Sequence, residues 1–276
     1  TLITSSAASD VYKRQKVTHF VDIDEVSVSY NLGEPPVLEG ASLKMSKGEF
    51  VALVGPSGCG KSTFMKLMSG LLKADQGSVV VANQDVTRPL GNVGMAFQNS
   101  VMLPWRTTLN NLLLPLEIAR PHRETFRQKR QAHANKAIEL LSSVGLKDVA
   151  EKYPWELSGG MRQRASLCRA LIHEPEVLML DEPFGALDAF TREELWCVLR
   201  DLWHERKFTV LLVTHDLIES AFLADRVLVM SNRPGRVIME LEVPFERPRN
   251  LDIRFEKEFV DIVHQLRDQI RTARAA

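Results

Sequence analysis

The strongest constraint on the fold of this chain is the segment Gly55–Ser62, which reads GPSGCGKS and matches the pattern G-x-x-x-x-G-K-[ST]. It follows the apolar run Phe50–Val54, typical of a buried strand, and precedes apolar residues at helical spacing from Phe64 to Leu72. Glycines let backbone N–H groups curl around phosphate oxygens, and the helix start adds partial positive charge. The alternative is a plain glycine-rich turn, which the agreement of motif and context disfavours. The segment therefore predicts a nucleotide phosphate site.

Two side chains of this segment have predicted roles. Lys61 is expected to reach the β- and γ-phosphates of ATP, and the Ser62 hydroxyl is expected to bind Mg²⁺. Cys59 is interpreted as a small filler rather than a nucleophile. The predicted nucleotide-binding residues of the loop are Gly55, Pro56, Ser57, Gly58, Cys59, Gly60, Lys61, Ser62 and Thr63.

Further apolar runs alternate with helical patterns along the chain. Runs at Val177–Leu180, Thr209–Val213 and Val227–Met230 predict strands, and alternation over 17–30 predicts another. Strands that alternate with helices indicate an α/β fold with a mostly parallel sheet.

Three helical features complete the expected organisation. A helix over Thr191–Leu202 is predicted to start with a capping box made by Thr191 and Glu194. The stretch from Thr107 to Ile172 has almost no strand signal and indicates a helical insertion. Near the C-terminus one amphipathic helix is predicted from the spacing of Phe255, Phe259, Ile262, Leu266 and Ile270.

Composition narrows the class of protein. The 276 residues carry 35 Lys+Arg and 35 Asp+Glu, so zero net charge gives no global attraction to nucleic acid. No window of 18 consecutive apolar residues is present, which excludes a membrane span. The three scattered cysteines favour neither a disulfide framework nor a zinc site and fit a reducing cytoplasm. Residues 1–16 are interpreted as a disordered or artefactual leader.

Asp181 and Glu182 follow the apolar run Val177–Leu180, at a strand end where α/β sheets bind ligands. Asp181 is expected to hold Mg²⁺, and Glu182 to orient or deprotonate the attacking water. Adjacent strand residues point to opposite faces, so the strand must end here for both to serve one site. Two acids in a solvated turn are the alternative.

A second predicted helix start lies at Leu157–Arg164, which reads LSGGMRQR. Ser158 is expected to cap the helix, whose first turn offers a hydroxyl, glycine amides and a positive dipole end suited to a γ-phosphate. The first loop already accounts for one nucleotide. The second site is therefore expected to serve the nucleotide of another copy.

In these motifs the chain resembles the ATP-binding subunits of ABC transporters, over about Val17 to Met239. GPSGCGKST looks like Walker A, VLMLDE like Walker B, and LSGGMRQR like the family signature. GALD at Gly185–Asp188 resembles the D-loop, although related chains often carry Ser where Gly185 stands. The remaining matches are Gln98 to the Q-loop glutamine, His215 to the switch histidine and Tyr30 to the aromatic that stacks on adenine.

The resemblance implies a P-loop core with a mostly parallel sheet, an antiparallel β subdomain and an inserted helical subdomain at about 99–172. The ATPase domain would cover 17–243, and 244–276 would form a C-terminal helical extension. It implies ATP and Mg²⁺ as cofactors, with Ser62, Gln98 and Asp181 at the metal. The implied catalytic residues are Glu182, His215, Gln98 and Lys61.

The resemblance also implies a head-to-tail homodimer or heterodimer that sandwiches two ATP molecules. Ser158, Gly159, Gly160 and Asp188 of one subunit would face the nucleotide held by Lys61 of the other. The other implied partners are permease subunits and, indirectly, a periplasmic or lipid-anchored binding protein. The subunit would lie on the cytoplasmic face of the inner membrane, with no nucleic acid partner.

The segments LPWRTTLNN, KYPWELSGGMRQR and SNRPGRVIMELEVPFERPR resemble the nitrate/sulfonate/taurine group of importers. Pyrimidine-precursor, bicarbonate or phthalate-like uptake would give a similar sequence. Trp105 is expected at the interface with the membrane subunit, and packing in the core is its alternative. Two other functions compete: a soluble ABC ATPase acting on DNA or ribosomes, and a P-loop small-molecule kinase. The kinase would leave LSGGMRQR without a purpose.

Overall fold

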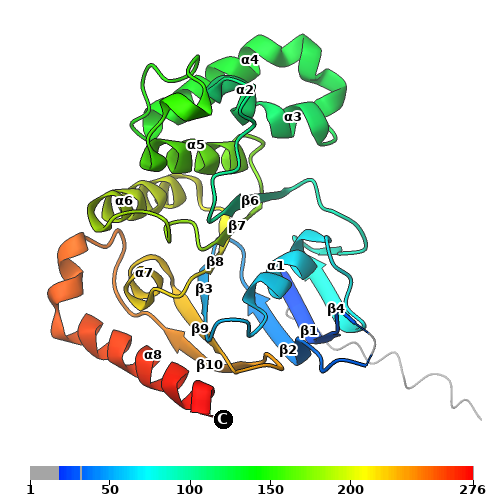
Figure 1. The fold of residues 1–276 in the computed structure, drawn as a ribbon, viewed down its shortest axis with the longest axis vertical. Coiled ribbons are helices and arrows are strands. Elements are labelled where there is room, and N and C mark those ends of the chain that lie inside the picture. Colours follow the sequence, from blue (N-terminus) through cyan, green and yellow to red (C-terminus); the bar gives the residue numbers. More distant parts are fainter. Residues whose placement is uncertain (1–18, 32, 276) are drawn as a thin grey trace, which may run out of the picture.

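Two β-sheets lie together in the lower half of Figure 1, and a lobe of helices stands above them. The computed structural model describes residues 19–31 and 33–275. The leader expected over residues 1–16 lies outside the described residues.

The larger sheet has the strand order β10-β9-β3-β8-β7-β6, parallel except that β10 is antiparallel to β9. The smaller sheet has the order β2-β1-β4-β5 and is antiparallel throughout. The predicted α/β class, with a mostly parallel sheet and an antiparallel β subdomain, is confirmed. The strands are β1 (Val21–Val28), β2 (Leu38–Met45), β3 (Phe50–Val54), β4 (Gln76–Val81), β5 (Gln84–Asp85), β6 (Val93–Phe97), β7 (Val177–Asp181), β8 (Thr209–Val213), β9 (Arg226–Met230) and β10 (Val237–Glu242).

The central strands are buried on both faces, which explains why their sequences are continuous apolar runs rather than alternating ones. In β3, Phe50 and Ala52 pack into one hydrophobic core, while Val51 and Leu53 pack into the other. The parallel sheet therefore separates two cores. One lies against the antiparallel sheet and α1, and the other against α5 to α8.

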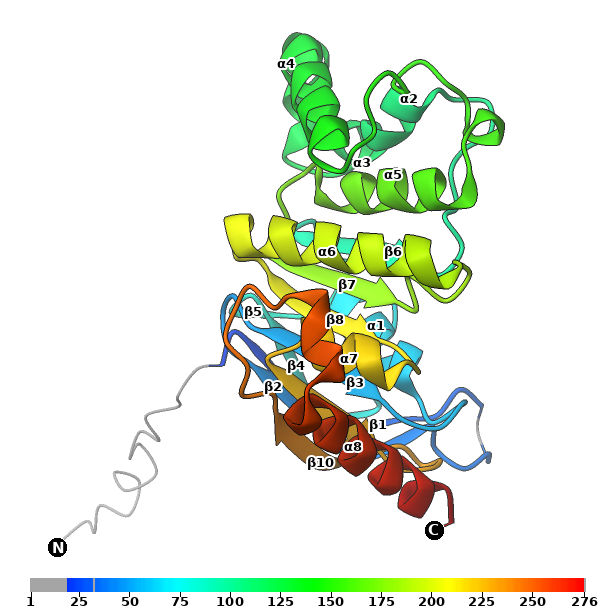
Figure 2. The same ribbon diagram turned by 90° about the vertical axis from the view of Figure 1, so that its left-hand side faces the viewer.

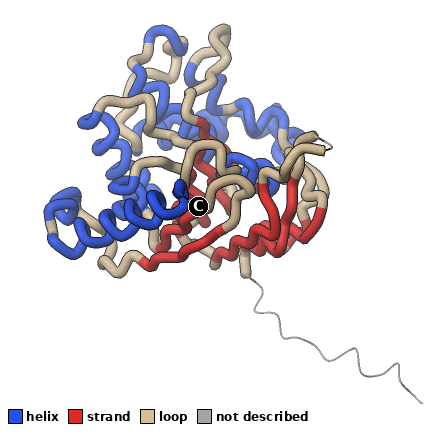
Figure 3. The backbone as a smooth tube through the Cα atoms, turned by 60° about the horizontal axis from the view of Figure 1, so that its bottom comes forward, coloured by secondary structure: helices blue, strands red, loops and turns tan. Residues whose placement is uncertain are grey.

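The helices cover the two faces of the parallel sheet and form the upper lobe, which contains α2 to α5 (Figure 2). Figure 3 shows the strands gathered in the lower half of the view, with most helices above and to one side of them. The helices are α1 (Lys61–Ser69), α2 (Thr108–Leu112), α3 (Leu114–Ile118), α4 (His122–Ser143), α5 (Gly159–Leu171), α6 (Ala189–Arg206), α7 (Leu217–Leu223) and α8 (Lys257–Ala275), with 3-10 turns at Pro154–Glu156 and Leu251–Phe255.

Two expectations about helix boundaries are wrong. Helix α6 begins at Ala189, and its cap is Asp188, whose carboxylate accepts a hydrogen bond from Thr191 N at 3.0 Å. The expected capping box at Thr191 and Glu194 therefore does not form, and Glu194 instead pairs with Arg164 at 2.5 Å.

Phe255 was expected on the apolar face of the last helix. It lies in the 3-10 turn before α8 and is 80% exposed. The helix starts two residues later, so its buried face is made by Phe259, Val263 and Leu266.

Within the described ranges, no helix combines the length and the apolar character that a bilayer crossing requires.

Candidate functional site

The carboxyl ends of four neighbouring strands meet at one edge of the parallel sheet. Leu53 of β3 and Asp181 of β7 both stand opposite Val213 of β8, and Phe97 of β6 stands opposite Asp181. The segments that follow these strands are the phosphate loop, Gln98, Glu182 and His215. Ligands bind at this edge in open α/β sheets, so four motifs scattered along the sequence share one site.

The phosphate loop has the backbone that its glycines allow. Gly58 and Gly60 have φ of 77° and 104°, in the left-handed region that favours glycine. A Cβ on Gly60 would also lie 2.6 Å from Leu38 Cδ2. Because Gly60 is the N-cap of α1, the free N–H groups of the first helical turn line the loop.

Lys61 folds back over its own loop. Its Nζ donates hydrogen bonds to Gly55 O at 3.0 Å and Pro56 O at 2.9 Å, and the residue is only 8% exposed. Cys59 is buried beside it, and this burial raises the pKa of the thiol. A protonated, buried thiol is a poor nucleophile, which agrees with the interpretation of Cys59 as a filler.

A cleft of about 470 Å³ opens beside the phosphate loop, and Tyr30 and Arg233 lie on its walls with Lys61. Tyr30 follows β1 and is about half exposed. Its hydroxyl lies 3.3 Å from Thr63 Oγ1, and the Lys66 ammonium lies 5.4 Å from the centre of its ring. Tyr30 therefore stands next to the loop with part of its ring open to the cleft.

Asp181 reaches the phosphate loop from the end of β7. Its Oδ1 accepts a hydrogen bond from Ser62 Oγ at 3.4 Å. Partial burial raises the pKa of Asp181, and the neighbouring Glu182 charge raises it further, while the Ser62 hydrogen bond acts in the opposite direction. Two hard oxygen donors this close fit Mg²⁺, which binds few protein oxygens alongside substrate phosphates.

Glu182 has a φ of 46°, in the left-handed region that is unusual for a residue other than glycine. The strand thus ends at Asp181, and the turn meets the condition that both carboxylates reach one site. The Glu182 N–H donates to Val213 O at 2.8 Å, which fixes this turn against β8. Backbone strain of this kind is often found at functional sites.

His215, Gln98 and Gly185 gather around Glu182. His215 Nδ1 lies 3.3 Å from Glu182 Oε2. A Cβ on Gly185 would lie 3.2 Å from Gln98 Nε2 and 3.8 Å from His215 Cε1. The glycine that replaces the more usual serine therefore lies between the predicted Q-loop and switch residues.

The predicted second phosphate site has the expected local structure. Ser158 caps α5 and accepts a hydrogen bond from Met161 N at 3.3 Å. A Cβ on Gly160 would lie 2.6 Å from Thr191 Cγ2, whereas one on Gly159 would meet nothing within 4 Å. The helix start thus packs against α6 through Gly160 and is open at Gly159.

This second site is not brought to the phosphate loop of its own chain. Ser158 and Gly160 line a separate depression of about 280 Å³, which shares no lining residue with the cleft at Lys61. Asp188 is the N-cap of α6, the helix that packs against the start of α5. Ser158, Gly159 and Asp188 are therefore available to a second molecule.

Three residues that line the Lys61 cleft, Glu34, Val37 and Arg233, are not among those predicted from the sequence. Arg233 comes from the loop between β9 and β10, and Glu34 from the segment after Tyr30. For Arg233 the signal in the sequence is the segment SNRPGR, part of the stretch that resembles the nitrate/sulfonate/taurine group.

Similarity to known proteins identifies the family of this chain. The family model described as ABC transporter matches residues 38–185, which is more than half of the chain. The chain belongs to the ABC transporter family. It is an ATPase subunit of that family, which binds ATP and couples its hydrolysis to transport.

Several curated relatives are similar to this ABC ATPase over most of their length. The bicarbonate transport ATP-binding protein CmpD of Synechocystis sp. is 43% identical, with 86% of this chain and 84% of that protein covered. The nitrate import ATP-binding protein NrtD of Synechococcus elongatus is 43% identical, with 84% of each covered. The aliphatic sulfonates import ATP-binding protein SsuB of Bacillus licheniformis is 42% identical, with 77% and 80% covered.

Two solved structures of an ATP-binding cassette, MJ0796, share the fold. A dimeric post-hydrolysis state bound to ADP and Pi aligns with a TM-score of 0.67 at 30% identity, covering 82% of this chain and 100% of that one. A second dimeric structure of the cassette aligns with a TM-score of 0.68.

Proposed function

We propose that this ABC ATPase powers import of a small solute by ATP-driven closing and opening of a dimer beneath a membrane permease. The observation that carries the proposal is the arrangement of the two phosphate sites. In each chain Lys61 and Glu182 line one cleft, with Asp181 bonded to the phosphate loop beside it, while Ser158 lines a separate depression. Two chains in head-to-tail orientation would complete each other.

In this proposal ATP binds in the cleft beside the phosphate loop. Tyr30 stacks on adenine, and backbone N–H groups of the phosphate loop surround the phosphates. Lys61 moves from its own loop carbonyls to the β- and γ-phosphates. Ser62, Asp181 and Gln98 hold Mg²⁺, which neutralises charge on the phosphates when it is bound.

Hydrolysis takes place at the end of β7. The Glu182 carboxylate accepts a proton from the water that attacks the γ-phosphate, and Gln98 helps to position this water. His215 contacts the γ-phosphate from the neighbouring strand end. His215 lies next to Glu182, so displacement of either side chain would disturb the other. This supports a shared role of the two residues in hydrolysis.

The dimer would place Ser158, Gly159 and Gly160 of one subunit against the γ-phosphate held by its partner, with Asp188 nearby. The dimeric MJ0796 cassette, which is bound to ADP and Pi in one structure, supports this arrangement. Loss of the γ-phosphate removes a contact that exists only in the closed state, so hydrolysis shifts the population to the open state.

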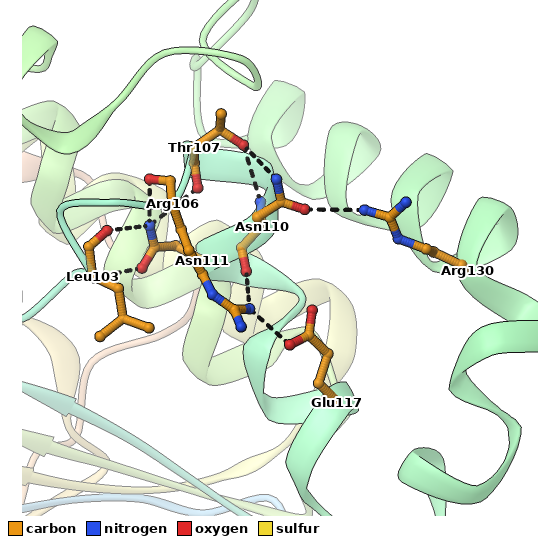
Figure 4. A network of polar contacts seen from close by, with 7 residues as sticks. All are labelled: Leu103, Arg106, Thr107, Asn110, Asn111, Glu117 and Arg130. Carbon is orange, nitrogen blue, oxygen red and sulfur yellow. Dashed lines mark hydrogen bonds and ion pairs between the residues drawn. The ribbon is translucent and has the colours of Figure 1, made fainter.

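The helical lobe presents a surface suited to the permease. Trp105 is 71% exposed, which disfavours the core position considered as its alternative. Its loop is held by buried Asn111, whose side chain bonds to the backbone of Leu103, Arg106 and Thr107 at 2.7 to 3.1 Å (Figure 4). A rigid loop with an exposed aromatic tip loses little entropy on binding.

The same network ties this loop to the rest of the lobe. Arg106 pairs with Glu117 at 2.7 Å, and Arg130 donates to Asn110 Oδ1 at 3.2 Å (Figure 4). A force applied at Trp105 would therefore reach α3 and α4. We infer that the lobe, at about 99–172 within an ATPase domain of 17–243, transmits motion to the permease on the cytoplasmic face of the inner membrane.

The solute belongs to the class handled by the relatives, whose names give bicarbonate, nitrate and aliphatic sulfonates. These are small oxyanions, and taurine shares the sulfonate group. A periplasmic or lipid-anchored binding protein would deliver the solute to the permease. The relatives are transport proteins, which favours this function over the soluble ABC ATPase on nucleic acid or ribosomes.

The test is the substitution Glu182→Gln in the full chain, with Glu205→Gln on the exposed part of α6 as a control of equal charge. Steady-state phosphate release should fall by about 10²-fold or more in Glu182→Gln, because the general base is lost. ATP binding should persist, and an ATP-dependent dimer should accumulate in size-exclusion chromatography. Parental hydrolysis by Glu182→Gln, or a strictly monomeric ATP-loaded variant, would contradict the proposal.

A further inference from the structure

The loop Ser231–Arg236, between β9 and β10, lies directly against the phosphate loop. Gly235 N donates to Val37 O at 2.8 Å, and a Cβ on Gly235 would lie 1.9 Å from Cys59 O. No larger residue fits there without displacing one of the two loops. The position of this loop relative to the phosphate loop is therefore fixed by backbone contact.

The other side of this loop rests on the C-terminal helix. Asn232 Nδ2 donates to Arg274 O at 3.1 Å, near the end of α8. Arg236 forms an ion pair with Glu39 of β2, and Arg233, Arg236 and Thr272 line a cavity of about 480 Å³ beside α8. The loop is thus held between the phosphate loop and α8.

Arg233, at the centre of the loop, extends into the nucleotide cleft that Tyr30 and Lys61 also line. It donates a hydrogen bond to Pro35 O at 3.3 Å. In the part of the chain that the structure describes, Arg233 forms no ion pair. Glu34 lines the same cleft but accepts a hydrogen bond from Asn31 Nδ2 at 3.0 Å. Among the described residues, Pro35 O is the one acceptor that the Arg233 guanidinium contacts, so its other donors can bind a ligand in the cleft.

We propose that Arg233 is a further nucleotide-binding residue, whose guanidinium donates to the phosphates of ATP held by its own chain. The inference rests on the proposed function, since it takes the cleft at Lys61 as the ATP site. A guanidinium matches phosphate oxygens with paired, charge-assisted hydrogen bonds. Because backbone contacts already fix the loop, binding costs only the ordering of one side chain.

The experiment measures the dissociation constants of MgATP and MgADP by titration calorimetry on the full chain. Arg233→Ala should raise both dissociation constants by about tenfold, as expected for loss of a charged hydrogen bond at an exposed site. Arg233→Lys should lose about threefold, because it keeps the charge and loses the paired geometry. Arg236→Ala removes the same charge from the same loop on the side facing Glu39, so both constants should stay within about twofold of the parental values.

MgADP separates a contact within one chain from a contact in the closed dimer. A loss confined to MgATP would overturn the assignment to the chain's own cleft. An equal loss of nucleotide affinity in Arg233→Ala and Arg236→Ala would also overturn it. So would dissociation constants of Arg233→Ala that stay within about twofold of the parental values. The proposed function stands or falls separately, on hydrolysis by Glu182→Gln and on MgATP binding by the parental chain.

Discussion

His215 Nδ1 and Glu182 Oε2 lie 3.3 Å apart although the two residues follow different strands. The register between β7 and β8 pairs Asp181 with Val213, which brings both strand ends to the same level. The left-handed turn at Glu182 then directs its carboxylate to the histidine. Sheet register and one unusual backbone angle thus create the contact.

This contact predicts the behaviour of His215→Ala. Its turnover number should fall by about 10²-fold, because a γ-phosphate contact and the neighbour of the base are lost together. The dissociation constant of MgATP should stay within about threefold, since most binding contacts lie in the phosphate loop. Phosphate release and calorimetry measure the two quantities. His264→Ala, on the exposed side of α8, is the matched control. A turnover number equal to the parental one would remove His215 from the site.

Gly159 and Gly160 differ in what surrounds them, and this difference predicts opposite outcomes. Gly160→Ala should lower the free energy of unfolding by about 1–3 kcal/mol, because its Cβ would overlap Thr191 Cγ2. Gly159→Ala should leave it unchanged or raise it by about 0.5–1 kcal/mol, since alanine favours the helix and meets no neighbour. Urea unfolding of the two variants tests both values.

The same pair tests the dimer. In a Glu182→Gln background with ATP, Gly159→Ala should abolish the dimer seen by size-exclusion chromatography, because the methyl group occupies the side open to the partner's phosphate. Retention of a parental dimer by Gly159→Ala would show that α5 does not face the second nucleotide.

The positions of Asp181, Glu182 and His215 at one edge of the sheet were predictable from sequence, because each residue lies at the end of a short apolar run. Asp181 and His215 were placed correctly at strand ends, since parallel strands bring their carboxyl ends to one edge. Strand β6 was missed, because VGMAF is short and contains a glycine, and only family resemblance placed Gln98. Strands β2, β4, β5 and β10 also lie outside the strands predicted from the sequence.

Other features depend on contacts between distant segments. The sequence predicts Thr191 as the start of α6, whereas Asp188 is the cap, and packing of Gly160 on Thr191 goes with this earlier start. The role inferred for Arg233 depends on Gly235 meeting Cys59, which no local pattern reveals. Local apolar patterns therefore predicted the central strands of the parallel sheet, and tertiary packing decided the loops that line the cleft.

Arg249 joins the C-terminal extension to α7, and we expect its substitution to cause a large loss of stability. It is 2% exposed and donates at 2.6 to 3.1 Å to the carbonyl oxygens of Ala221, Phe222, Ala224 and Val243. Burial lowers its pKa to about 10, so the guanidinium still carries its charge near neutral pH.

Arg249→Met should reduce the free energy of unfolding by about 3 kcal/mol, because several buried carbonyls lose their donor. Arg271→Met, on the exposed side of α8, should change it by less than about 0.5 kcal/mol. Urea unfolding compares the two variants. Equal stability of Arg249→Met and the parental chain would mean that the extension is not held by this residue.

Glu219 lies in the first turn of α7, and we expect it to make the stability of the protein depend on pH. The residue is 3% exposed, and burial raises its pKa to about 8, with the Asp216 charge adding to the shift and Arg192 opposing it. Between its ordinary pKa and about 8, the unfolded chain has an ionised Glu219 while the folded chain keeps it protonated. The folded state then binds the extra proton, so this residue makes the protein less stable as pH rises through that window.

Glu219→Gln removes this cost. The free energy of unfolding of Glu219→Gln minus that of the parental chain should therefore increase by about 1.4 kcal/mol for each pH unit between pH 5 and 8. Urea unfolding at pH 5.5, 6.5 and 7.5 in one buffer system measures the slope of this difference. Glu205→Gln, exposed on α6, controls for the change in net charge and should show a flat difference. A flat line for Glu219→Gln as well would mean that the carboxyl is ionised in the folded protein, with Arg192 outweighing the effect of burial.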